Sequence, residues 1–212
     1  MKNLVLLLAV CIIVVSACRQ NGAVETQAEP FEETPPKNLR TSPAEPTKNT
    51  FVPYFIAQGQ YYAQPAYFQE VKANTLAFTA IFDRSAIYQT KNPANQFSIN
   101  KLYGFSDCGV HHQTNSARFG WCWLNGAVRI YTYCYINGKR VAEVELGQAE
   151  IDKPLDYRLE IRQNTYIFTF KGKQTVILRG CTNPALFKYR LFPYFGGTEA
   201  APQNITIKLK EL

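Results

Sequence analysis

The sequence is poor in the residues and motifs from which most catalytic sites are built. It contains two histidines, two tryptophans and one methionine among 212 residues. No cysteines have the paired C-x-x-C spacing of zinc sites, and no G-x-S-x-G motif surrounds a serine nucleophile. No repeat of fixed period is visible, which argues against a propeller or a solenoid. Helical spacing of apolar residues is hard to find, so β-structure is the expected fold class.

The chain begins with a basic residue and an unbroken apolar run over 4–15, too short and one-sided for a comfortable membrane span. The run ends in the tetrapeptide V-S-A-C, whose cysteine is Cys18. This pattern resembles the lipobox of bacterial lipoproteins, in which the cysteine thiol receives a lipid before cleavage on its N-terminal side. The resemblance implies a signal peptide over 1–17, lipidation of Cys18 and membrane attachment through that lipid. An ordinary signal peptide or an uncleaved anchor helix is the alternative.

The residue after the cysteine is Arg19, where the lipoprotein rule for inner-membrane retention wants an aspartate. We therefore expect an outer-membrane lipoprotein. The sequence does not show whether the domain lies on the periplasmic or the outer face of that membrane. The segment 18–49 is rich in Pro, Glu and Thr and has almost no large apolar residues, which predicts a disordered tether. The segment 50–212 is dense in aromatic and branched residues and predicts one domain.

The domain is basic. Segment 1–49 holds five cations and five glutamates, so the net charge of +7 belongs to 50–212. A basic surface suits acidic glycans or anionic lipids, whereas nucleic acid is the least plausible partner for a secreted, tethered protein.

Alternating and β-branched segments predict strands almost throughout the domain, and the dipeptides N-G at 125–126 and 137–138, with Q-N at 163–164 and the turn at 171–173, predict hairpins. Strand candidates every roughly 8 to 12 residues indicate a sandwich or a barrel. We favour an all-β, two-sheet antiparallel jelly-roll sandwich of the broad concanavalin A-like kind over a closed barrel. The main predicted strands are Thr75–Phe82, Ala127–Ile136, Val141–Leu146, Tyr157–Ile161, Tyr166–Phe170, Thr175–Leu178 and Ile205–Leu209.

Four cysteines remain in the domain once the signal and Cys18 are set aside, and an envelope location permits disulfides. Cys122 and Cys134 lie on neighbouring predicted strands, so they form a cross-strand pair if the register allows it. The alternative joins Cys108 to Cys181, and free buried thiols are a third option. A metal site using Cys108 and Cys122 with the two histidines is a weaker alternative, so no metal or cofactor is expected.

The segment 100–123 gathers both histidines and both tryptophans of the chain. An indole face covers the apolar side of a pyranose, and an arginine fork grips a carboxylate or sulfate. The alternative is structural. Trp121 and Trp123 lie on one face of the strand and are as readily explained as core residues, and Asp107 and Asn115 as residues that make hydrogen bonds in turns. The candidate ligand-binding residues are Asp107, His111, His112, Asn115, Arg118, Trp121 and Trp123.

The segment 189–197 is a second dense aromatic stretch, and Pro193 within it predicts an edge or bulged strand. Taken with the motif around 111–121, it is similar to uncharacterised lipid-anchored envelope proteins of glycan-using bacteria. That resemblance implies no established reaction and no site residue.

Catalytic patterns are weak. Glu143 and Glu145 do not continue into the E-x-D-x-x-E pattern of sandwich glucanases, and a solvated strand face explains them better. Sandwich polysaccharide lyases use His, Tyr, Arg and Gln or Asn around an acidic sugar, and His112 (or His111) as base, Tyr133 (or Tyr103) as acid and Arg118 as carboxylate clamp form such a set.

Three hypotheses follow, and the first leans away from catalysis. The first is a non-catalytic envelope module that binds a ligand, most simply a glycan. The second is a lyase or hydrolase acting on an acidic glycan. The third is a structural or assembly lipoprotein that binds another envelope protein through its aromatic edge segment.

Overall fold

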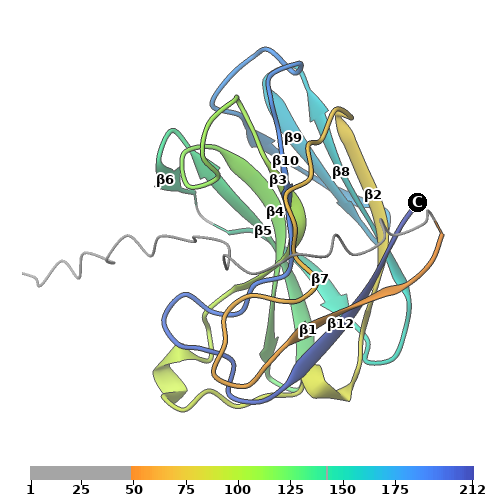
Figure 1. Cartoon of the computed structure of the whole chain (residues 1–212), viewed down its shortest axis with the longest axis vertical. Helices are drawn as coiled ribbons and strands as arrows, with labels where there is room; N and C mark the ends of the chain where they lie inside the picture. The colour runs from red at the N-terminus through yellow and green to blue at the C-terminus, as the bar shows by residue number, and fades with distance from the viewer. Residues whose placement is uncertain (1–48, 142) are drawn as a thin grey trace, which may run out of the picture. The chain divides into compact units, whose positions relative to one another are not determined.

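The computed structural model describes residues 49–141 and 143–212 (Figure 1). The expected signal peptide over 1–17, the lipidated Cys18 and all but the last residue of the tether lie outside the described residues. No helix within the described ranges is long and apolar enough to cross a membrane.

One sheet, called sheet I, has six antiparallel strands in the order β1-β12-β2-β8-β9-β10. On β2, Leu76, Phe78, Ala80 and Phe82 are buried, which is the period of two expected when one face of a strand packs on a core. The strands are β1 (Val52–Ile56), β2 (Thr75–Phe82), β8 (Leu155–Arg162), β9 (Thr165–Phe170), β10 (Lys173–Leu178) and β12 (Ile205–Glu211).

The other sheet, called sheet II, has the order β11-β3-β4-β5-β6, and β7 also pairs with β5. Every pair in it is antiparallel. Two short 3₁₀ helices, Arg84–Ala86 and Pro93–Asn95, lie between β2 and β3. The strands are β3 (Asn100–Ser106), β4 (Ser116–Leu124), β5 (Ala127–Ile136), β6 (Lys139–Arg140), β7 (Glu145–Ala149) and β11 (Arg190–Leu191). The predicted two-sheet jelly-roll sandwich is confirmed.

The predicted hairpin turns are confirmed by their backbone angles. Asn125 and Gly126 join β4 to β5 with φ of 52° and 76°, and Asn137 and Gly138 join β5 to β6 with 51° and 78°. Two positive φ angles in a row define the type I′ turn, which Asn-Gly adopts with least strain and which matches strand twist. The turns at 163–164 and 171–172 connect β8 to β9 and β9 to β10, with φ of 50° at Gln163 and 48° and 75° at Lys171 and Gly172.

One strand prediction is wrong in position. The alternation over 141–146 predicted a single strand, but pairing along β6 stops at Arg140 and β7 begins only at Glu145. The ladder between β5 and β7 also contains a register shift: Ile130 pairs with Gly147 and Tyr131 with Glu145, so Leu146 of β7 is a bulge. A local alternation pattern does not reveal such a bulge.

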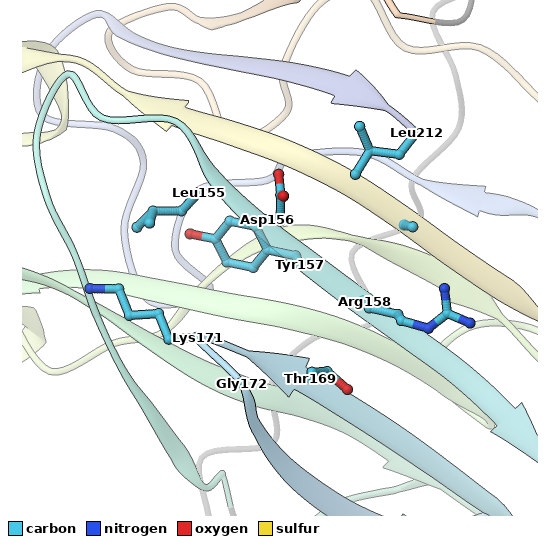
Figure 2. A pocket seen from close by; sticks show the side chains of 9 residues that line it. Leu155, Asp156, Tyr157, Arg158, Thr169, Lys171, Gly172 and Leu212 are labelled. Atoms are coloured by element: carbon cyan, nitrogen blue, oxygen red, sulfur yellow. The ribbon is translucent and has the colours of Figure 1, made fainter.

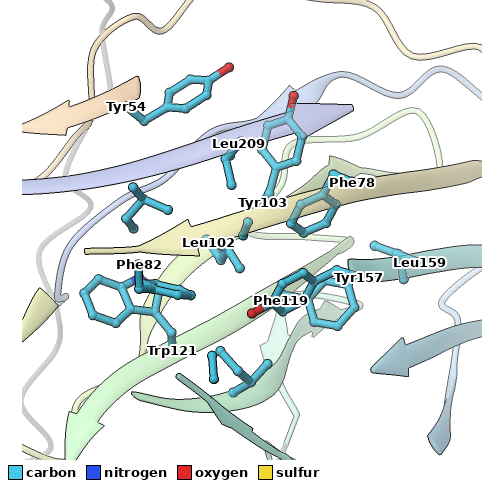
Figure 3. Packing of buried hydrophobic residues seen from close by; sticks show 14 of the residues in the cluster. Tyr54, Phe78, Phe82, Leu102, Tyr103, Phe119, Trp121, Tyr157, Leu159 and Leu209 are labelled. Atoms are coloured by element: carbon cyan, nitrogen blue, oxygen red, sulfur yellow. The ribbon is translucent and has the colours of Figure 1, made fainter. Parts of the chain in front are cut away.

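Aromatic rings from both sheets fill the space between them (Figure 3). Phe78 of sheet I stacks on Tyr157 with ring centroids 5.0 Å apart and meets Phe119 of sheet II edge-on at 5.8 Å. Offset and edge-to-face contacts of this kind add to the burial of each ring, which alone contributes about 1.5–3 kcal/mol. This shared core fixes which face of each sheet is left for a ligand.

Candidate functional site

Strand β4 divides the predicted ligand residues between its two faces. Ala117, Phe119 and Trp121 are fully buried between the sheets, and Trp121 packs on Phe82 with ring centroids 5.0 Å apart (Figure 3). Trp123 has the same parity and is partly buried against this core. The prediction that the tryptophans form a sugar platform is therefore corrected: side chains alternate along a strand, so they face away from Arg118.

Asp107 supports the fold and does not face a ligand. Both of its carboxylate oxygens accept hydrogen bonds from Arg179, at 2.7 and 2.9 Å, and Tyr166 donates its hydroxyl at 2.7 Å. The carboxylate and the guanidinium are fully buried. Burial of two charges is tolerated here because each carboxylate oxygen accepts at least one hydrogen bond and the guanidinium is paired with it. The predicted ligand-binding role of Asp107 is corrected to a structural one.

Asn115 is also structural. Its side-chain oxygen accepts the backbone N–H of Asn137 at 2.9 Å, which ties the loop before β4 to the hairpin after β5. The side chain is buried, as expected of an amide that replaces a missing backbone partner. The predicted ligand contact is corrected accordingly.

The four cysteines of the domain form one disulfide and leave two free thiols. Cys108 is bonded to Cys181, and Cys122 and Cys134 are free and buried. The cross-strand pair is excluded by register, because Cys122 lies opposite Arg129 and Cys134 lies opposite Ala117.

The disulfide also bears on the metal alternative. Cys108 has no thiolate to offer as a ligand, and the cluster of Asp107 with the two half-cystines is therefore not a set of metal donors.

Arg118 marks the other face of sheet II. It is 6 % exposed, and its Nε has no hydrogen-bond partner among the described residues. Its guanidinium lies over the ring of Tyr133, the residue opposite it on β5, at 5.4 Å from the centroid. No carboxylate within 49–141 or 143–212 forms an ion pair with it. A buried guanidinium in this state is costly unless a further group accepts from it.

Two other cations gather around the same tyrosine. Lys101 lies between two rings, 5.0 Å from the centroid of Tyr133 and 5.2 Å from that of Tyr194, and it donates to the Gly196 carbonyl. Arg140 lies 5.9 Å from the Tyr133 centroid and forms an ion pair with Glu143. The face is therefore positive, with aromatic rings between the charges.

Glycine at position 104 makes room for this arrangement. Gly104 pairs with Arg118, and a Cβ placed on it would lie 2.1 Å from the Ala117 carbonyl oxygen and 2.8 Å from Cγ of Arg118. Those separations are far below any real contact, so only glycine lets the arginine stem lie across β3.

His112 is buried beside the cations and hydrogen-bonded to a tyrosine. Its backbone N–H donates to the hydroxyl of Tyr189 at 3.1 Å, and its Nδ1 lies 2.9 Å from the same hydroxyl. Burial, followed by the charges of Arg118, His111 and Lys101, lowers the pKa of His112 to about 3. The imidazole is therefore neutral at neutral pH, and its Nδ1 and the Tyr189 hydroxyl share one hydrogen bond.

Tyr133 also keeps its neutral form. Burial raises the pKa of its hydroxyl, and the neighbouring charge of Arg118 offsets this only in part. The phenol is thus a proton donor at this face.

Of the predicted site residues, the structure brings Arg118, His112 and Tyr133 together and leaves His111 exposed beside His112, with ring centroids 4.1 Å apart. We define these first three residues together with Lys101 and Tyr189 as the basic face. Sequence reasoning missed Lys101, which reads as an ordinary solvated lysine at the start of a strand. It also missed Tyr189, whose proximity depends on pairing between β11 and β3 across a long sequence separation.

A hollow of about 360 Å³ lies elsewhere, over β2, β8 and β9 of sheet I (Figure 2). The charged side chains that line it, Asp156, Arg158 and Lys171, are exposed, and Arg158 is paired with Glu160 at 2.9 Å. Charges in such a setting are well hydrated and bind ligands weakly. The basic face is the better candidate site because its arginine is already desolvated.

No protein-family model matches the chain, and no curated protein sequence matches it. Solved structures do resemble it. Alginate lyase AlyC3 aligns with a TM-score of 0.55 and 11% identity over 76% of this chain and 74% of that one. The structure of AlyC3 in complex with dimannuronate aligns with a TM-score of 0.54 and 11% identity over 76% of this chain and 73% of that one. An alginate lyase from Alteromonas sp. 272 aligns with 0.50 and 8% identity over 80% of this chain and 88% of that one. At these identities the chain shares the jelly-roll fold of these enzymes.

Proposed function

We propose that the basic face of sheet II binds an anionic glycan without transforming it. The observation that carries this proposal is Arg118: its guanidinium is nine-tenths buried, stacked on Tyr133, and without a partner for Nε or a carboxylate among the described residues. A ligand carboxylate or sulfate would supply the missing negative charge and accept hydrogen bonds from the guanidinium.

The surroundings of Arg118 suit a sugar acid better than a bare anion. Tyr133 presents an aromatic ring beside the guanidinium, and Lys101 adds a second positive charge 5.0 Å from the centroid of that ring. The jelly-roll likeness supports the choice of ligand, because one structure of the same fold was solved with dimannuronate, an oligomer of a uronic acid.

The proton chemistry favours binding over catalysis. A lyase needs a base that removes a proton next to the sugar carboxylate, and an effective base has a pKa near the working pH. The pKa of His112 lies at about 3, and burial raises that of Tyr133, so neither group is tuned for that task at neutral pH. Turnover of an acidic glycan remains the second candidate, because His112, Tyr133 and Arg118 do lie together.

Titration of the purified full chain with mannuronate oligomers, followed by calorimetry and by ultraviolet absorbance of unsaturated sugar, tests the proposal. We expect binding without absorbance growth. Arg118→Met should weaken binding at least thirtyfold, the equivalent of about 2 kcal/mol, whereas Arg158→Met on sheet I should not. Absorbance growth that is lost in His112→Ala would identify a lyase instead. Absence of binding to any charged or neutral glycan would favour an envelope-protein partner.

We also propose that the chain is anchored in the outer membrane by a lipid on Cys18, which the lipobox over 15–18 supports. Metabolic labelling with a palmitate analogue should mark the wild-type chain and not Cys18→Ser, and the variant should leave the membrane fraction. A label that persists in the variant would contradict the anchor.

A further inference from the structure

Three aromatic rings form an exposed shelf beside the basic face. The ring centroids of Phe68 and Phe187 are 6.1 Å apart and nearly parallel, and Tyr189 lies 6.0 Å from Phe68 and 6.1 Å from Phe187. Phe68 is 72 % exposed and Phe187 45 %. Apolar rings rarely gather in solvent without a function. We call Phe68, Phe187 and Tyr189 the aromatic shelf.

The shelf is continuous with the basic face through a single side chain. The ring of Tyr189 completes the shelf, and its hydroxyl is the one hydrogen-bonded to His112. His112 in turn lies within the electrostatic reach of Arg118. The shelf therefore adjoins the basic face at Tyr189 and His112.

Paired backbone holds the shelf in place. The residues that follow Phe68 pair with the segment that carries the other two rings, through Val71 N–H to the Lys188 carbonyl at 2.8 Å and Arg190 N–H to the Gln69 carbonyl at 2.8 Å. Gly109 donates to the Phe187 carbonyl at 3.0 Å, one residue after the disulfide-bonded Cys108. Little ordering is then needed when a ligand stacks on the shelf, which favours binding.

We propose that the aromatic shelf is a second subsite, which stacks the apolar face of a sugar ring next to the sugar whose carboxylate binds Arg118. This inference rests on the proposed function and extends it from a single charged sugar to an oligosaccharide. The pyranose ring presents C–H groups on one face, and these pack on an aromatic surface while its hydroxyls stay in water.

The size and setting of the shelf favour a sugar over a protein. A stable protein interface buries about 800 Å² on each partner, whereas three partly buried rings, each of about 200 Å² at most, offer far less. The adjacent cations attract the same acidic chain that Arg118 would bind, so charge and apolar contact favour one ligand.

The subsite predicts that affinity rises with oligosaccharide length and that the rise depends on the shelf. We would titrate the full chain with mannuronate monosaccharide, followed by nuclear magnetic resonance, and with its hexasaccharide, followed by calorimetry. In the double variant Phe68→Ala with Phe187→Ala, hexasaccharide affinity should fall about tenfold and monosaccharide affinity should stay within about twofold. The control is Phe97→Ala, since Phe97 is also exposed, at 69 %, but belongs to no part of the shelf.

The outcomes separate this inference from the function on which it rests. Arg118→Met should weaken both ligands, because it removes the charged subsite. If the wild-type chain binds both ligands and the double variant binds the hexasaccharide equally well, the shelf is not a subsite, while the anion site stands. If both ligands weaken equally in the double variant, the shelf acts on the basic face itself and the inference is wrong. If the wild-type chain binds neither, both proposals fall together.

Discussion

Arg179 and Arg118 are both buried arginines, and they are in opposite states. Arg179 donates to both oxygens of Asp107 and, from Nη1, to the Gln163 carbonyl at 2.6 Å. Arg118 has a tyrosine ring for a neighbour and an Nε without a partner. The difference teaches that burial alone does not mark a functional charge. Arg179, with all its partners, supports the fold, whereas Arg118 keeps hydrogen-bonding capacity that the described residues do not use.

The largest expected effect comes from breaking the satisfied pair. Asp107→Ala leaves the guanidinium of Arg179 buried without its carboxylate, so the free energy of unfolding should fall by about 3–5 kcal/mol. Urea denaturation measures it. Replacing both partners, with Asp107→Leu and Arg179→Met, should restore part of the loss. A single variant as stable as the wild type would contradict the structural role of Asp107.

The disulfide next to that pair is expected to matter somewhat less. It closes a sequence separation of 73 residues, and cross-links of this kind stabilise by about 2–4 kcal/mol by restricting the unfolded chain. The double variant Cys108→Ser with Cys181→Ser should show this loss in the same urea titration. Treatment with reductant should not change the free energy of unfolding of the double variant. In the wild type it should lower that free energy by about as much as the double substitution does.

Lowering the pH should destabilise the fold through His112, which lies near Arg118. The folded-state pKa of His112, about 3, lies below the ordinary histidine value of about 6.5, so between these limits the unfolded chain binds the proton more tightly. Stability contributed by the neutral imidazole is therefore present above pH 6.5 and is lost as the pH falls, by about 2 kcal/mol at pH 5. His112→Asn should remove this slope, and His111→Asn, at the exposed neighbour, should keep it. Equal slopes in wild type and His112→Asn would refute the assignment.

The smallest expected effect sharpens the comparison most. Arg118→Met removes a buried charge that lacks a protein partner and keeps most of the side-chain volume. The free energy of unfolding should change by less than about 1 kcal/mol, and an increase is as consistent as a decrease. Thermal and urea unfolding check this. A loss as large as that of Asp107→Ala would place Arg118 among the structural arginines.

Sequence periodicity predicted the fold because strands, Asn-Gly turns and the sandwich depend on local patterns. The same periodicity also separates the two faces of β4: Phe119 and Trp121 have one parity and Arg118 the other, so no single face holds Trp121 with Arg118. The candidate binding set joined the tryptophans to Arg118 because these residues lie close together in the sequence, and for the tryptophans that prediction was wrong.

Other parts of the site were beyond local reasoning. The partner of Asp107 lies 72 positions along the chain, and Tyr189 lies 77 positions from His112. Such pairings follow from the order of strands in a sheet, which a single sequence does not encode in any short motif. Local patterns could name Arg118 and His112 as candidates, but only the sheet order shows which polar residues near them are already occupied.

Strand β10 is one of the two edge strands of sheet I, the other being β1, and among the described residues it pairs with β9 alone. Val176 and Leu178 on it are 57 % and 68 % exposed, and Lys173 at its start is the charged residue of the strand. An apolar edge of this kind is a template on which another chain adds a strand, and native proteins usually block it with charge. Aggregation of the protein at high concentration will therefore begin at β10, and Val176→Lys is the substitution that should keep concentrated samples monodisperse.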